Sequence, residues 1–152
     1  MVGFKQLNWI FLITVFSGIK MFGQDLDITF KVTNYSIDGV SLDEEALQGD
    51  IALHFYACSD ESICFSNHWR NSNSQSYGKV YALKKSDFPE TESEHRYSVL
   101  KFTWDFENSY DDVSGQAAVT LTTIYIGNTI KFTAEILVLD TNSLLSMKGY
   151  VE

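Results

Sequence analysis

The residues best suited to chemistry in this sequence are two cysteines and two histidines: Cys58, Cys64, His54 and His68. Thiolate sulfur and imidazole nitrogen are zinc ligands, but compact zinc sites repeat their ligands at short spacings that this set lacks. In an oxidising compartment, two cysteines separated by a short loop are typical of a disulfide. We therefore predict a Cys58–Cys64 disulfide and neither a metal site nor a cofactor. The bridge requires Cα atoms within about 7 Å of one another.

Acidic residues suggest two further kinds of chemistry. On one strand face, the backbones of Asp105 and Glu107 would lie roughly 6 to 7 Å apart, near the separation that glycosidases use. No neighbour in the sequence would make one of them a proton donor, so a carboxylate-dependent hydrolase is only the alternative function. Residues 107–112 offer oxygen atoms for calcium, but they lack the alternating ligands and central glycine of a calcium loop. We expect a solvated turn there.

A polar stretch at residues 66–78 has no clear periodicity, and we predict that it is a long loop. It contains Trp69, Arg70 and Tyr77 among asparagines and serines. Recognition loops use this mixture of aromatic, amide and hydroxyl groups. These three residues are therefore a candidate partner-binding loop, although a tryptophan in such a loop often packs back onto its own fold.

The usual signatures of catalysis and cofactor binding are absent from the sequence. It has no Gly-x-Ser-x-Gly nucleophile motif, no phosphate-binding glycine loop and no dinucleotide fingerprint. We therefore predict no catalytic residue and no cofactor-binding residue.

The elements that must position these residues are β-strands, and the last third of the chain shows this most clearly. Apolar and polar residues alternate there, as they do on a strand with one buried face. The predicted inward residues of two segments are Leu100, Phe102, Trp104 and Phe106, followed by Ile130, Phe132, Ala134, Ile136 and Val138. The segment between them holds Ala117, Val119 and Leu121 in one phase, with Ile124 and Ile126 in the other. A bulge near residues 122–123 would turn all five inward.

Three more segments have the same pattern. Their predicted inward sets are Leu26, Ile28, Phe30 and Val32; Ile51, Leu53, Phe55 and Ala57; and Leu145, Met147 and Val151. Gly127-Asn128 predicts a two-residue hairpin loop, because such loops need positive φ. Ser41 with Glu44 resembles a capping box, which predicts a short helix ending at Gly49. Residues 84–96 contain four acidic residues and a proline, and we predict a second loop there.

These patterns predict an all-β fold. We expect an antiparallel meander of about seven strands that forms a sandwich or a barrel, with at most one short helix. Strands of about eleven residues favour strong coiling or closure.

Residues 1–23 have the features of a secretory signal peptide: an early lysine, a short apolar core and no acidic residue. Cleavage after Gly23 or after Ser17 fits the pattern, and residues 24–152 then form one domain. The apolar core is shorter than a membrane span needs, so we expect no span after cleavage. This predicts a secreted or periplasmic protein.

The chain is acidic, with 11 basic and 20 acidic residues and a formal net charge of −9. Removal of 1–23 takes away two lysines and makes the charge −11. Such a field repels phosphate backbones and anionic lipids, so we expect neither nucleic acid nor a membrane surface as a partner. The leading expectation is an exported, non-catalytic binding or accessory module for a small apolar ligand or a protein partner.

Overall fold

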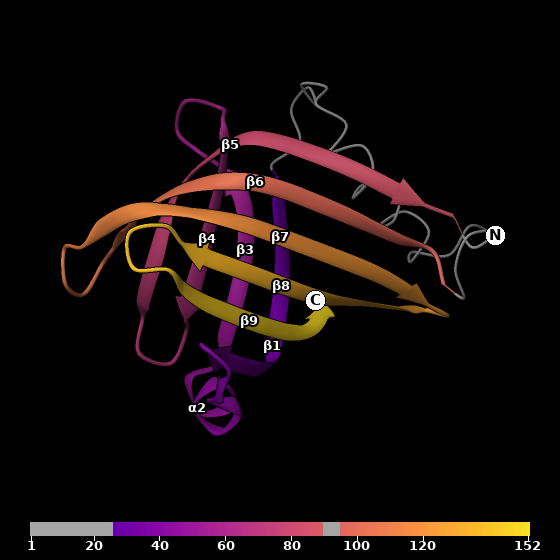
Figure 1. Cartoon of the computed structure of the whole chain (residues 1–152), viewed down its shortest axis with the longest axis horizontal. Coiled ribbons are helices and arrows are strands. Elements are labelled where there is room, and N and C mark those ends of the chain that lie inside the picture. Colours follow the sequence, from indigo (N-terminus) through magenta and orange to yellow (C-terminus); the bar gives the residue numbers. More distant parts are fainter. Residues whose placement is uncertain (1–25, 90–94) are drawn as a thin grey trace.

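A computed structural model of the chain describes residues 26–89 and 95–152; the predicted signal peptide lies outside these residues. Within them the chain forms nine strands and one short helix, which confirms the predicted all-β class (Figure 1). The elements are β1 (Asp27–Ile37), β2 (Val40–Ser41), α2 (Asp43–Gly49), β3 (Ile51–Ala57), β4 (Ile63–Trp69), β5 (Ser74–Phe88), β6 (Tyr97–Asn108), β7 (Ser114–Ile126), β8 (Thr129–Val138) and β9 (Ser143–Val151).

The strands form one antiparallel sheet that closes on itself. Its order is β2-β1-β3-β4-β5-β6-β7-β8-β9, and β1 also pairs with β9. Eight strands therefore make an up-and-down barrel, to which the two-residue β2 adds at the end of β1. Strands as long as the 15 residues of β5 coil strongly, and closure leaves the barrel strands with few free edges.

The seam between β1 and β9 contains two local irregularities. A bulge between Val32 and Asn34 shifts the register. The next inward residue after Val32 is therefore Tyr35 rather than residue 34. On the facing strand, a Cβ atom at Gly149 would overlap the carbonyl oxygen of Lys31. Glycine is therefore required where the two backbones approach most closely.

Aromatic rings fill the middle of the barrel. Phe55 lies 4.8 Å from Phe65 and 5.5 Å from Phe102 between ring centroids, and Phe30 lies 6.0 Å from Phe55 and 5.3 Å from Phe132. Phe30, Phe55 and Phe65 are fully buried. Edge-to-face contacts of this kind add to the burial of apolar area. The rings thus form a continuous contact from β1 and β8 across to β6.

Two predicted loops are strands in the structure. Residues 66–78 form the end of β4, a turn at 70–73 and the start of β5, while residues 84–88 complete β5. The periodicity is hidden because inward positions of these strands carry polar residues such as Asn67 and Ser76, which pair with each other in register.

The predicted bulge in β7 is wrong. β7 pairs with β6 and β8 without a register shift, so Thr123 and Tyr125 continue the inward phase. Ile124 and Ile126 consequently face outward, and Ile126 is 36% exposed. The two-residue loop at Gly127-Asn128 is confirmed, with Gly127 at φ 57°.

The predicted helix exists, but its predicted cap is wrong. α2 begins after Leu42, which makes no side-chain capping bond. The carboxylate of Asp43 instead accepts hydrogen bonds from the backbone N–H of Tyr35, at 2.7 Å, and from Asn34 Nδ2, at 3.1 Å. None of the residues described here belongs to a helix with the length and apolarity that a membrane crossing needs.

The closure predicts a specific effect of Gly149→Ala. The added methyl group has to displace the β1 backbone at Lys31, so we expect a loss of about 2 kcal/mol or more in the free energy of unfolding. Urea denaturation followed by circular dichroism measures it. The control is Lys148→Ala on the exposed face of the same strand, which should change stability by less than about 0.5 kcal/mol. Equal stability of both variants would contradict the tight seam.

Candidate functional site

The barrel has two different ends. The helix end carries α2 and the turns at 70–73, 109–113 and 139–142. We call the opposite end the open end, because none of the described residues forms a helix there. It carries the turns at 58–62 and 127–128 and the far ends of β5 and β6. At the open end β5 extends beyond β4, which pairs only with residues 74–79 of β5. On its other side β5 stays paired with β6 as far as Phe88. Figure 1 shows β5 and β6 running on past β4.

A bulge in this extended part of β5 turns charged residues inward. The register with β6 shifts between Tyr81 and Lys84, and Ala82 has a φ of 52°. After the shift, Lys85 pairs with the buried Leu100, and Asp87 pairs with the buried Ser98. Among the described strands, these two are the charged residues at inward positions of the barrel. Charged side chains at such positions need partners.

The carboxylate of Asp87 has a partner on each oxygen. Lys85 Nζ lies 3.1 Å from Oδ2, and Ser98 Oγ donates to Oδ1 at 2.6 Å. The lysine side chain is only 14% exposed, whereas the aspartate side chain is 58% exposed. The pair therefore consists of a largely buried cation and a carboxylate at the mouth of the barrel.

Arg96, Thr123 and Tyr125 complete this group. The Arg96 guanidinium lies 4.8 Å from the centroid of the Tyr125 ring, a cation–π arrangement. Thr123 is 3% exposed and is paired in register with Ser98. We call Lys85, Asp87, Arg96, Ser98, Thr123 and Tyr125 the open-end cluster.

Electrostatics fix the protonation states of two of its members. Burial alone would raise the pKa of Asp87, but hydrogen bonds from Ser98 and Lys85 and the charges of Lys85 and Arg96 leave it below its ordinary value. Burial raises the pKa of Tyr125, although hydrogen bonds with Thr123 and Ser98 and the charge of Arg96 oppose this effect. At neutral pH the carboxylate is ionised and the phenol keeps its proton.

The predicted partner-binding residues do not form one loop. Trp69 ends β4, and its ring lies 6.1 Å from Tyr35 between centroids and covers Gly49 of α2. Tyr77 faces outward from β5. Its pKa is raised, mainly by a hydrogen bond with Glu107 and to a smaller extent by loss of contact with water. The structure thus separates Tyr77 from Trp69 and Arg70.

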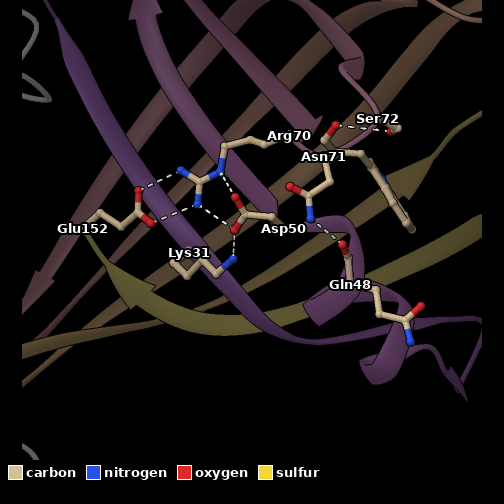
Figure 2. Close-up of polar contacts among 8 residues, drawn as sticks. Lys31, Gln48, Asp50, Arg70, Asn71, Ser72 and Glu152 are labelled. Atoms are coloured by element: carbon tan, nitrogen blue, oxygen red, sulfur yellow. Dashed lines mark hydrogen bonds and ion pairs between the residues drawn. The ribbon is translucent and has the colours of Figure 1, made fainter.

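Arg70 belongs to an ion-pair network that fixes α2 (Figure 2). Its guanidinium lies 2.9 Å from Asp50 at the end of the helix and 3.0 Å from Glu152 near the C-terminus. Lys31 of β1 pairs with the same aspartate. Asn71, the next residue, donates to the carbonyl of Gln48 at 2.6 Å. Arg70 and Asn71, in the turn after β4, therefore join the C-terminal end of α2 to the barrel.

The other sequence candidates have separate partners. Cys58 and Cys64 form a disulfide with Cα atoms 5.4 Å apart. His54 Nε2 lies 2.6 Å from Asp27 Oδ1. Asp105 accepts from Gln116 at 2.7 Å. Across the two described ranges, no three His, Cys, Asp or Glu side chains are grouped to hold a metal ion.

Sequence reasoning missed the open-end cluster because it treated residues 84–96 as a loop. The alternation of β6, continued backwards from Leu100, would have placed Ser98 inward. Lys85 and Asp87 could not be assigned to a face, because the bulge at Ala82 leaves no mark in the residue pattern.

Comparisons of the chain with protein-family models, with curated proteins and with solved structures find no match.

The network around Asp50 predicts a pH-dependent effect of Asp50→Asn. Hydrogen bonds from Lys31 and Arg70 lower the pKa of Asp50, so its stabilising effect is complete above the ordinary carboxyl pKa of about 4 and disappears as pH falls through the lower folded value. At pH 7 we expect a loss of about 1 kcal/mol, measured by urea denaturation.

The matched control is Asp112→Asn. Asp112 also has a left-handed backbone, with φ 55° against 51° for Asp50, and asparagine adopts this conformation readily. Asp112 is exposed in a turn. The control should match wild-type stability at pH 7 and at pH 2. A loss for Asp50→Asn that stays constant down to pH 2 would contradict the role of the ionised carboxylate.

Proposed function

We propose that the protein is a non-catalytic binding module that takes a small polar ligand at the open-end cluster. The observation that carries the proposal is the inward-facing pair Lys85–Asp87 at the mouth of a barrel whose middle is filled by apolar side chains. A largely buried cation rarely improves stability over an apolar side chain of similar size, so the presence of Lys85 here favours a role in recognition. The neighbouring hydroxyl groups of Ser98, Thr123 and Tyr125 supply further hydrogen-bonding groups.

The packing of the barrel supports a polar ligand over the apolar one that the sequence suggested. The contacting rings of Phe30, Phe55, Phe65 and Phe102 occupy the middle of the interior. An apolar ligand would have to displace well-packed side chains, which costs several kcal/mol. The open-end cluster lies outside these rings, and its Asp87 side chain is 58% exposed.

A protein partner at the helix end is the second candidate. Six large apolar side chains are exposed in the helix, turns and strand ends there: Val40, Leu47, Tyr110, Val113, Leu139 and Leu144. Tyr110 is 65% exposed, yet it lies close to Tyr35. The pKa of Tyr35 is raised to about 12, mainly because Tyr35 is buried and to a smaller extent because Tyr110 is near. Exposed apolar groups gathered at one end of a domain favour contact with another protein.

A carboxylate-dependent hydrolase has less support. The open-end cluster contains one carboxylate, and its contacts with Lys85 and Ser98 keep it ionised. Sugar hydrolysis needs a protonated acid beside a second carboxylate. Asp105 and Glu107 lie on the outer face of β6 and bind Gln116 and Tyr77.

Export remains part of the proposal. The Cys58–Cys64 disulfide fits a protein that works in an oxidising compartment outside the cytoplasm. Recovery of the oxidised protein from the periplasm or medium, without residues 1–23, tests this location directly.

The proposed binding site predicts a localised response in NMR. Amide resonances of the folded protein are recorded while a set of small polar molecules, both charged and neutral, is added. We expect the shifts to concentrate at Ser98, Thr123 and Tyr125, because these residues line the open-end cluster. Shifts concentrated at Tyr110 and Leu139 would favour the helix end. The absence of any shift at the open end would contradict the proposed function.

A further inference from the structure

We propose that the open-end cluster is a receptor for the carboxylate group of a ligand, and that Asp87 occupies this receptor in the free protein. The inference rests on the proposed function and specifies its ligand class. It is carried by the way in which the chain binds its own carboxylate at the mouth of the barrel.

The geometry is that of a two-point carboxylate site. Lys85 and Ser98 contact different oxygens of the Asp87 carboxylate, at 3.1 and 2.6 Å. The two donors come from neighbouring strands that are paired residue by residue, so their spacing is set by the sheet. Charge-assisted bonds to both oxygens give the strongest and most specific recognition of this group.

Burial distinguishes the receptor from its occupant. Lys85 is 14% exposed and Ser98 is 7% exposed, so both are largely shielded from water. Asp87 is 58% exposed and can rotate outward to a hydrated position. The buried ammonium needs an anion beside it, whereas the aspartate does not need the ammonium. A ligand carboxylate can therefore replace Asp87 at little cost to the fold.

The local charges favour an anionic ligand at this position. Lys85 and Arg96 are close enough to Asp87 for both charges to lower its pKa, and outward rotation of Asp87 leaves Lys85 without the carboxylate that it contacts. This local attraction acts against the net charge of −9 of the whole chain, which repels anions. Thr123 and Tyr125 lie next to the site and can hydrogen-bond to a second polar group of the ligand.

The filled interior limits the size of the ligand. Leu100, which pairs with Lys85, is 3% exposed, and the ring cluster begins with Phe102 in the next inward position. The ligand must therefore remain at the mouth with its carboxylate pointing inward. A small carboxylic acid with a short body fits these limits better than a long-chain fatty acid.

The test uses the folded, oxidised protein and four probes: acetate, benzoate, phosphate and sulfate. Each is titrated at constant ionic strength, and binding is measured from the amide shifts of Ser98 and Thr123. We expect the wild-type protein to bind the two carboxylates and to bind phosphate and sulfate at least about tenfold more weakly, since the receptor offers two donors for two oxygens.

Four variants separate the roles of the residues. Asp87→Asn removes the internal competitor and should tighten carboxylate binding about fivefold, the equivalent of one exposed ion pair. Lys85→Met should weaken it more than about tenfold. The control Lys84→Met removes the same charge from the preceding residue, which faces outward. It should leave binding unchanged. Lys85→Arg retains a cation and partial binding, which guards against misfolding of the methionine variant.

Each contrary outcome overturns the inference in a different way. Weaker carboxylate binding by Asp87→Asn would mean that Asp87 belongs to the receptor. Equal losses in the Lys84 and Lys85 variants would mean unspecific attraction, and equal binding of phosphate would mean a general anion site. If the neutral molecules of the NMR screen proposed above shift Ser98 while acetate and benzoate do not, the proposed function stands and the carboxylate class is removed. No response to any molecule would remove both.

Discussion

The pairing of β1 with β9 is the constraint on which the rest of the structure depends. Closure gives each barrel residue either an inward or an outward position, because side chains alternate across a strand. The bulge after Val32 and the glycine at 149 allow the two backbones to meet at the seam. Without this closure the phenylalanines of β1, β3 and β8 would lie on the open face of a sheet.

The same closure gives the charged pair its unusual position. Beyond residue 79, β5 is paired with β6 but no longer with β4, and its bulge at Ala82 changes which face the following residues occupy. Lys85 and Asp87 thereby enter the mouth of the barrel, where water is partly excluded and their interaction is stronger than on the surface. The helix end is built differently: ion pairs around Asp50 fix α2 from outside, and aromatic rings pack beneath it.

Much of the fold could be predicted from alternation alone. The inward residues of β3, β6 and β8, and those of β1 as far as Val32, have an unbroken two-residue period. A glycine–asparagine loop marks the turn between β7 and β8. Prediction failed where the inward face carries polar residues, as at Asn67 and Ser76. The hydroxyl of Ser76 donates to Asn108, which comes from a distant part of the chain. It also failed in β7, where Ile124 looks like a core residue but continues the outward phase.

The candidate site was harder to predict than the fold. Bulges in β1 and β5 decide which residues face inward, and neither has a distinctive residue type, since Thr33 and Ala82 are common in regular strands. Trp69 and Arg70 looked like free recognition groups because their partners, Gly49, Asp50 and Glu152, are remote in sequence or come from another element. Tertiary contacts settle such positions, and one sequence does not contain them.

The measurement that tests this account most directly is the rate at which an amine-reactive reagent modifies Lys84 and Lys85 in the folded protein, read by tandem mass spectrometry. The two lysines are adjacent on β5, and the bulge at Ala82 places Lys84 outside and Lys85 inside the barrel. The account predicts that Lys85 reacts many times more slowly than Lys84, and that the rates become equal in denaturant. Equal rates in the folded protein would mean that Lys85 is not inside the mouth.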